Sequence, residues 1–380
     1  MYSPARYNHW AGDIYYKTTD MINITPSFKK LRLLFSALVA AACCCATPAA
    51  AQSDKGITFA FAGDIMQGTT FPEDGVSYLP SNDGKDLFKD VTEILSQADI
   101  AAANNEGTLL DRGGTVKRCG DPKLCYAFRT PTSYTSNLVN AGIDFMSIAN
   151  NHINDFGPEG VRSTENALRQ AGIAFAGLRD RCETAIIERN GKKIGFAAFG
   201  HNKGTLSILD MEEVDRVIKA LKQQTDIVVV SFHGGGEGAK FSHVPAGMEQ
   251  CFGEERGDLR KFTHRAVDAG ADVVYGHGPH VTRGLELYND RLIIYSLGNF
   301  ATPYRVNLKG INGYAPVVTV KTDGNGKFVS GQIHSFIQQR GIGPRKDTTN
   351  TVAAHMARLS REDFPTSPLT ITNDGKISRK

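Results

Sequence analysis

The chain has 380 residues, with 43 lysines and arginines against 40 aspartates and glutamates, which gives a net charge of +3 at pH 7. Five of the basic and two of the acidic residues precede residue 52, which leaves 38 of each in the rest of the chain. With equal numbers of basic and acidic residues, this part of the chain has no net positive charge that would attract nucleic acid or an anionic membrane. We therefore expect no nucleic-acid partner. About 330 residues remain after this segment, which is ample for one large core.

The first 51 residues predict an export leader rather than part of the fold. Three basic residues between positions 29 and 32 precede an apolar run at 33–42, and the alanines at 49–51 are suited to cleavage. The run is shorter than the roughly 20 apolar residues of a membrane span, so we expect a signal peptide and an exported protein, periplasmic or extracellular. An uncleaved anchor, or a lipid on one of the cysteines at 43–45, is the less favoured alternative. Met21 is a candidate for the true start.

Strand-like apolar runs alternate with amphipathic, helix-like stretches along the rest of the chain. We expect strands at residues 57–62, 99–103, 145–149, 227–231 and 272–275, and helices at residues 85–97, 133–141, 158–171, 211–223 and 259–269. Hairpins are expected at residues 185–199, 285–296 and 317–334. The pattern predicts an α/β fold with a mixed sheet, or two sheets between helices. We place the domain at 52–340 and expect the polar extension at 341–380 to decorate it or fray.

Each of the five predicted strands is followed by a short polar signature. The signatures are Ala-Gly-Asp at 62–64, Asn-Asn-Glu at 104–106, Asn-Asn-His at 150–152, Phe-His-Gly at 232–234 and Gly-His-Gly-Pro-His at 276–280. Open α/β sheets bind ligands beyond the carboxyl ends of their strands, so these side chains are expected in one crevice. Their chemistry predicts a site for one or two divalent ions of Mn, Zn or Fe. The expected metal ligands are Asp64, Glu106, Asn151, His233, His277 and His280.

His152 directly follows the third predicted strand and is the candidate proton donor. An imidazole in this position can give a proton to a leaving group, and Asp155 is placed to orient it. The alternative is an Asx-rich turn that caps a helix beginning near Pro158. His201 ends a further strand at the same edge, and we keep it as a candidate pocket residue.

Four cysteines lie beyond the leader, and an even number in an exported protein predicts disulfides. Cys119 with Cys125 would close a small loop, and Cys182 with Cys251 would join distant parts of the chain. Four cysteines allow three pairings, and the sequence does not choose among them.

The series of motifs resembles the CapA family of poly-γ-glutamate capsule synthesis proteins, PGA_cap. The resemblance includes Phe-Arg-Thr-Pro at 128–131 and Ser-Leu-Gly-Asn-Phe at 296–300, and it covers residues 57–336. It implies a relation to the calcineurin-like metallophosphoesterases, and therefore a four-layer α/β/β/α sandwich with metals at the strand ends. It also implies the residue roles: Asp64 opens the site, Glu106 bridges, Asn151 is a ligand, His152 protonates the leaving group, and His233, His277 and His280 are the downstream ligands.

Two positions depart from the phosphoesterase pattern. Met66 stands where that pattern has a histidine, and a thioether is a poor ligand for a hard divalent cation. Glu106 stands in place of the bridging aspartate. These departures predict a weaker first metal site, with one ion as the alternative to two.

The predicted site is compatible with three different functions. In the first, a metal-dependent phosphoesterase uses an activated water, His152 as the acid and Arg129 to bind an anionic substrate group. In the second, the same pocket cleaves a γ-glutamyl polymer during capsule assembly. In the third, a non-catalytic export or assembly factor binds metal or polymer without turnover. The expected partners are an anionic polymer or phosphoester substrate and, in the membrane, other capsule-synthesis proteins.

Overall fold

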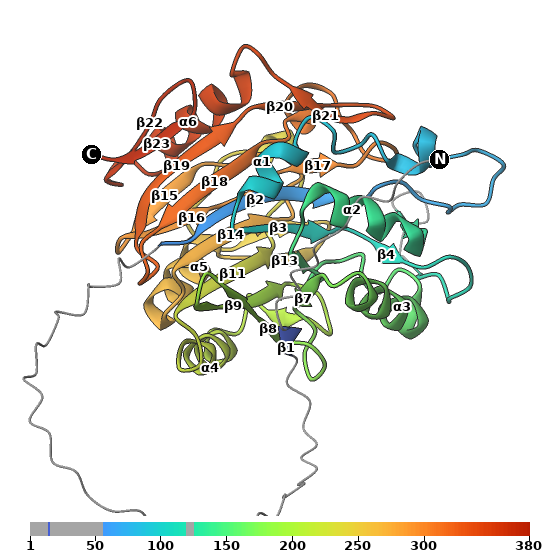
Figure 1. Cartoon of the computed structure of the whole chain (residues 1–380), viewed down its shortest axis with the longest axis horizontal. Coiled ribbons are helices and arrows are strands. Elements are labelled where there is room, and N and C mark those ends of the chain that lie inside the picture. Colours follow the sequence, from blue (N-terminus) through green and yellow to red (C-terminus); the bar gives the residue numbers. More distant parts are fainter. Residues whose placement is uncertain (1–13, 16–55, 119–124) are drawn as a thin grey trace, which may run out of the picture.

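The computed structural model describes residues 14–15, 56–118 and 125–380 (Figure 1). Two mixed sheets pack face to face, and helices cover their outer faces. The predicted signal peptide and its anchor and lipid alternatives lie outside the described residues. Within the described ranges, no helix is long and apolar enough to cross a membrane.

The first sheet has the strand order β22-β23-β19-β18-β2-β3-β6-β7, with β17 beside β2. Its parallel part consists of β2 (Thr58–Ile65), β3 (Ile100–Asn105), β6 (Phe145–Ser147), β7 (Ala174–Ala176) and β17 (Asn299–Ala301). Its antiparallel part consists of β18 (Val317–Thr322), β19 (Phe328–His334), β22 (Leu369–Ile371) and β23 (Lys376–Arg379).

The second sheet has the strand order β1-β8-β9-β11-β14-β16-β15, with β10 beside β9. Its parallel strands are β9 (Lys192–Gly200), β10 (Leu206–Ser207), β11 (Ile227–His233), β14 (Val273–His277) and β16 (Arg291–Ile294). Its antiparallel strands are β1 (Ile14–Tyr15), β8 (Thr184–Arg189) and β15 (Leu285–Tyr288). The β8–β9, β15–β16 and β18–β19 pairs confirm the three predicted hairpins.

Helices cover the outer face of each sheet. The first sheet packs on α1 (Thr92–Gln97), α2 (Thr135–Ala141) and α3 (Gly157–Gln170). The second sheet packs on α4 (Met211–Lys222) and α5 (Leu259–Ala269). The order helix, sheet, sheet, helix confirms the expected four-layer α/β/β/α sandwich. The helix predicted at 85–97 is shorter than expected, since only Thr92–Gln97 is α-helical.

The core between the two sheets is rich in aromatic side chains. Phe145 on β6 stacks on Phe196 on β9, with ring centroids 4.3 Å apart. Phe61 on β2 packs on Tyr275 on β14 at 4.6 Å. These four side chains are fully buried, so they fix the spacing of the sheets at the point where both carry predicted metal ligands.

The segment after Arg340 is part of the domain, which corrects the expectation that it decorates the domain or frays. β21 (Gly343–Lys346) pairs with β20 (Phe336–Gln339), and α6 (Thr351–Asp363) lies beside β22 (Figure 1). Four apolar residues of α6 are fully buried against the core between the sheets. This short apolar face was not recognised from the sequence, because the segment around it is polar. The face consists of Val352, Ala353, Met356 and Ala357.

The loops contain smaller elements. Two short strand pairs are β4 (Thr108–Leu109) with β5 (Arg129–Thr130), and β12 (Glu249–Cys251) with β13 (Glu254–Gly257). Short 3₁₀ helices span Ser81–Gly84, Thr132–Tyr134, Ala239–Phe241 and Gly310–Gly313.

Two of the four cysteines are free thiols. Cys182 and Cys251 are both buried and unpaired, so the structure rules out a bridge between them, which was one of the pairings that the sequence left open. The physical reason is their placement: Cys182 Sγ lies 3.7 Å from Glu165 Oε1 on α3, whereas Cys251 belongs to the β12–β13 hairpin. Cys119 lies outside the described residues, so its bridge to Cys125 stays a prediction.

Candidate metal centre

Strand register brings the predicted ligands together in pairs. His233 and His277 are direct partners on the neighbouring parallel strands β11 and β14. In the first sheet, Asp64 at the end of β2 is the partner of Asn104 on β3. Parallel strands present their carboxyl ends at the same edge of a sheet, which is why residues 40 or more positions apart meet here.

A glycine allows Asp64 to reach this edge. The β2–β3 register shifts between Phe61 and Asp64, and the Asp64 N–H donates to the carbonyl oxygen of Gly298 at 2.9 Å. A Cβ atom at Gly63 would lie only 2.1 Å from that same oxygen. No other residue fits at this position without moving the backbone, so the Gly-Asp motif encodes a close crossing of two chain segments.

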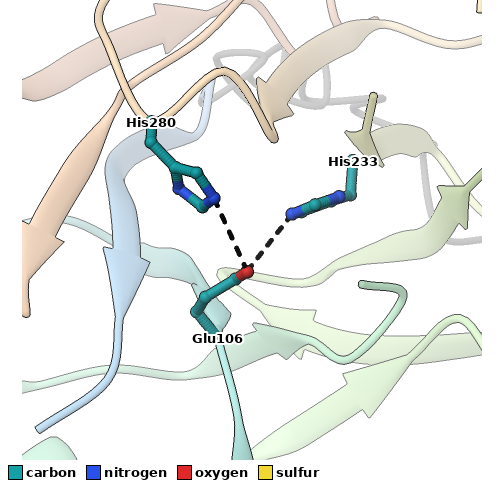
Figure 2. Close-up of side chains that lie close together, drawn as sticks. All are labelled: Glu106, His233 and His280. Atoms are coloured by element: carbon teal, nitrogen blue, oxygen red, sulfur yellow. Dashed lines mark ion pairs between the residues drawn. The ribbon is translucent and has the colours of Figure 1, made fainter. Parts of the chain in front are cut away.

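Glu106, His233 and His280 form the compact centre of the site (Figure 2). One potential ligand atom from each lies within 4.8 Å of the others. Glu106 Oε2 is 3.3 Å from His233 Nε2, and Glu106 Oε1 is 4.0 Å from His280 Nε2. The three residues come from the ends of β3 and β11 and from the loop after β14, so both sheets contribute.

Asp64 extends the centre on the other side of His280. His280 Nδ1 lies 2.8 Å from Asp64 Oδ2, and His277 Nδ1 lies 3.2 Å from Asp64 Oδ1. His280 adopts a left-handed backbone conformation with φ of +56°, which is uncommon for a residue with a side chain. This conformation places one imidazole between the two carboxylates of the site.

The carboxylates and imidazoles shift one another's pKa values. Burial is the largest influence on the pKa of Glu106 and raises it, but the charge and hydrogen bond of His233, together with the charge of His152, lower the pKa to about 2. Burial likewise opposes the shift of Asp64, whose pKa is lowered below its ordinary range by His277 and His280. Burial would lower the pKa of His280, but Asp64 and Glu106 raise it to about 10. Two buried carboxylates therefore favour a positive charge at the imidazole of His280 between them, which a proton supplies when no metal ion is bound.

The unpaired atoms of the centre fit a metal ion. Glu106 Oε1 and both ring nitrogens of His233 and of His277 are buried without a partner in hydrogen-bond geometry among the described residues. Buried polar atoms are normally paired, so five unpaired atoms on three neighbouring residues, each of which offers one ligand atom to a metal, need an explanation. Imidazole nitrogens with carboxylate oxygens are the donor set of Zn, Mn and Fe sites.

Asn104 and Asn150 support this centre through hydrogen bonds, whereas Asn151 is described by one buried atom alone. Asn151, an expected ligand, has a buried Oδ1 with no hydrogen-bond partner in the described part of the chain, so this oxygen remains available. Asn104 Nδ2 donates to Asp64 Oδ1 at 2.9 Å and to Glu106 Oε2 at 2.5 Å. Asn150 Nδ2 donates to Asn104 Oδ1 at 3.0 Å. Sequence analysis missed these two positioning roles, although the first Asn of each Asn-Asn pair was a visible signal.

His152 lies beside the centre with one nitrogen facing it. His152 Nε2 is 3.8 Å from Glu106 Oε1, and its Nδ1 is 2.8 Å from Asp155 Oδ2. Asp155 also accepts from the Phe128 N–H at 2.7 Å and pairs with Lys117 Nζ at 2.6 Å. The Phe128 ring packs on the imidazole with centroids 4.5 Å apart. Carboxylate and aromatic ring together hold the imidazole in one orientation.

Arg129 does not reach the site, which corrects the prediction that it binds an anionic substrate group. Its guanidinium pairs with Glu73, donates from Nε to Thr70 Oγ1 at 2.9 Å, and lies over the Phe156 ring. The side chain is buried and does not line the cavity at the metal centre. Because these partners already use its donors, Arg129 holds loops together instead of binding substrate.

His201 packs behind His233. Its ring stacks on the His233 ring at 5.8 Å, and its Nδ1 lies 3.3 Å from the His233 carbonyl oxygen. Burial, with the charges of His233 and Arg256, lowers the pKa of His201 to about 3. His201 is therefore a neutral imidazole that packs against His233, next to the group formed by Glu106, His233 and His280.

A cavity of about 330 Å³ opens at the metal centre. Glu106, His152 and His280 line it, and so does Met66, the residue at the position expected for a histidine ligand. The cavity also has a polar and aromatic rim that sequence analysis missed, with Tyr126, Phe128, Phe252, Asn299, Thr302, Arg305, Asn307 and Asn312.

Fold and site together define a two-sheet α/β protein with a buried cluster of carboxylates and histidines whose ligand atoms lie close enough to hold a metal ion. The chain belongs to the bacterial capsule synthesis protein PGA_cap family, whose model matches residues 58–304. This membership confirms the resemblance stated from the motifs.

The curated relatives carry capsule-related names. The capsule biosynthesis protein CapA of Bacillus anthracis is 25% identical over 293 residues, which cover 71% of this chain and 66% of that protein. The PGA biosynthesis protein CapA of Bacillus subtilis (strain 168) is 30% identical over 266 residues, which cover 65% of this chain and 64% of that protein. The chain thus spans just under two thirds of the length of these relatives.

Solved structures of similar architecture include phosphatases. A phosphatase from Mycoplasma pneumoniae aligns with a TM-score of 0.49 and 14% identity, over 75% of this chain and 95% of that one. A 5′-nucleotidase precursor from Thermus thermophilus aligns with a TM-score of 0.43 and 13% identity, over 74% of this chain and 54% of that one.

Proposed function

We propose that this protein is a divalent-metal-dependent hydrolase that cleaves an anionic substrate, a phosphoester or a γ-glutamyl polymer, in capsule synthesis. One observation carries the proposal: the buried ligand atoms of Glu106, His233 and His277 are unpaired beside an oriented acid, His152. The substrate class draws on the names of the relatives, which refer to capsule and PGA biosynthesis.

In this proposal, one set of residues binds the metal and another residue transfers the proton. A divalent metal held by Glu106, His233 and His280, with Asp64 and His277 beside them, would polarise the scissile group and lower the pKa of a water molecule. His152 gives its proton from Nε2, the nitrogen that faces the centre.

Asp155 and its neighbours keep His152 ready for this step. A hydrogen bond from Nδ1–H to Asp155 leaves Nε2 as the atom that carries or releases the proton. Lys117 balances the buried charge of Asp155, and the Phe128 ring keeps water from one face of the imidazole. The acid is therefore oriented before the substrate arrives.

The test combines metal analysis with turnover. Purified wild-type protein should contain metal and, with Mn²⁺ or Zn²⁺, should hydrolyse an aryl phosphate or poly-γ-glutamate. His233→Ala should lose both metal and turnover, whereas His152→Asn should keep the metal and lower kcat by about 10²- to 10⁴-fold. His264→Asn is the matched control, because His264 on α5 bonds to Glu286 and does not line the cavity.

The outcomes separate the substrates and the alternative. Release of glutamate oligomers without cleavage of the aryl phosphate selects the γ-glutamyl polymer. A metal-free wild type whose His152 and His233 variants behave like it would refute the hydrolase. Metal binding without turnover of either substrate would support the alternative, a non-catalytic metal- or polymer-binding factor.

A further inference from the structure

Arg305 lines the cavity and forms no salt bridge with a carboxylate in the described part of the chain. Of the described residues around the cavity, it is the only cationic side chain besides the histidines. None of the ion pairs within the described ranges includes Arg305, and its Nε is buried without a hydrogen-bond partner. A buried donor without an acceptor is costly, so this position suits an acceptor that comes from outside the chain.

Two tyrosines hold the guanidinium without using its donors. The Arg305 Cζ atom lies 5.0 Å from the centroid of Tyr78 and 5.5 Å from that of Tyr126. Cation–π contacts engage the face of the guanidinium and leave its N–H groups free to bond in the plane. The backbone of Arg305 has a φ of +66°, a left-handed conformation that is uncommon for Arg and is often found at ligand sites.

The neighbouring charges do not compete for this cation. The charge of Arg305 is one of the influences that lower the pKa of Asp74, but the Asp74 carboxylate accepts its hydrogen bonds from the Tyr78 hydroxyl at 3.0 Å and the Val76 N–H at 3.1 Å. Glu237, which also lines the cavity, accepts from Arg256 Nη1 at 2.8 Å. Arg305 is therefore positioned by aromatic rings while the nearby carboxylates are bonded elsewhere.

We propose that Arg305 is a specificity-determining residue that binds a carboxylate of the substrate, a second anionic group beside the one that reacts. This inference rests on the proposed function, because it assigns part of the substrate of the same site. The planar fork of a guanidinium matches a carboxylate with two parallel hydrogen bonds. A single cation balances a singly charged carboxylate, whereas a doubly charged phosphate would leave excess negative charge near Glu106 and Glu237.

The test measures binding and turnover separately. The first probe is a γ-glutamyl pentamer, compared with the same pentamer whose α-carboxylates are amidated and with inorganic tripolyphosphate. Metal-loaded, full-length wild type, Arg305→Gln and Arg305→Lys are titrated with each probe by calorimetry. Arg361→Gln on α6 is the matched control, since it removes an exposed arginine that does not line the cavity. Metal content and Tm establish that each variant is folded.

We expect Arg305→Gln to weaken binding of the pentamer by about 10- to 100-fold, with a smaller loss in Arg305→Lys and none in Arg361→Gln. The amidated pentamer should bind weakly to all four proteins. In Arg305→Gln, kcat/KM should fall further for a carboxylated aryl phosphate, through a higher KM, than for a diaryl phosphate that carries no carboxylate.

Each result decides the proposal. Equal affinity of wild type and Arg305→Gln for the pentamer would overturn it, as would failure of wild type to bind the pentamer. Loss confined to tripolyphosphate would assign the subsite to phosphate and also overturn it. Arg305-dependent binding without turnover by wild type would remove the hydrolase and leave the carboxylate subsite standing, so the two proposals fail separately.

Discussion

Replacing Glu249 by glutamine is expected to destabilise the protein by about 3–5 kcal/mol, because it breaks a buried ion pair and leaves an uncompensated charge. Arg283 Nη1 and Nη2 donate to the two oxygens of Glu249 at 2.8 and 2.7 Å. The two side chains are 0% and 2% exposed, so water cannot replace the lost partner. A glutamine would turn an amide N–H₂ toward a guanidinium that only donates.

The pair also supports the loop that follows His233. Glu249 Oε2 accepts from the Gly236 N–H at 2.9 Å, and Arg283 Nη1 lies against Gly235, where an added Cβ atom would be 2.9 Å away. We therefore expect the Glu249→Gln variant to bind the metal about 10- to 100-fold more weakly. Losses of this size are common when a residue that supports the metal ligands is mutated.

The assay is urea unfolding of wild type, Glu249→Gln and a control variant. The control is Arg216→Gln, which removes one side of a solvent-exposed pair with Glu183 at 3.1 Å and should cost less than about 1 kcal/mol. Replacing both buried partners, Glu249→Leu with Arg283→Met, should recover most of the lost stability. A Glu249→Gln variant that unfolds at the same urea concentration as the control, with the same slope, would refute this reasoning.

Three further predictions concern protonation and reactivity. Asp155→Asn should lower kcat about 10- to 100-fold with unchanged metal content, as measured by turnover and metal analysis, because His152 loses its orienting carboxylate. Burial and the charge of Arg358 lower the pKa of His355, so the unfolded chain binds a proton that the folded chain does not. The free energy of unfolding should therefore fall as the pH drops below about 6.5. In the His355→Gln variant, the midpoint of urea unfolding should change less between pH 7.5 and pH 5.5 than it does in the wild type. Burial and Glu165 raise the pKa of Cys182 to about 12, so iodoacetamide at pH 8 should label it only after unfolding, as judged by peptide mass spectrometry.

The positions of the strand-end motifs could be predicted from the sequence, because each depends only on an apolar run and the polar residues that directly follow it. The run at 227–231 is apolar at all but its last position, as expected of a parallel strand buried on both faces, and all residues of β11 are buried. Once such strands are placed in parallel, the polar residue after each must lie at the same edge. Asp64, Glu106, His233, His277 and His280 were found in this way.

Other features depend on contacts that the sequence does not display. Arg129 fits an anion-binding role by residue type, but its role is set by Glu73 and Thr70, which precede it by more than fifty residues. Arg305 gave no signal, because its importance comes from two distant tyrosines and a left-handed backbone. The C-terminal helix was missed because its apolar face is short and lies within a polar segment.

The site also depends on the packing between the sheets, which explains why neither sheet could form it alone. Asp64 lies three residues after Phe61 on β2, and His277 lies two residues after Tyr275 on β14. The Phe61–Tyr275 contact at 4.6 Å therefore fixes the distance between a carboxylate of one sheet and an imidazole of the other. Protein cores are close-packed and resist compression, so this contact sets a distance that flexible loops could not hold. The ligand geometry is consequently a property of the aromatic core as much as of the motifs.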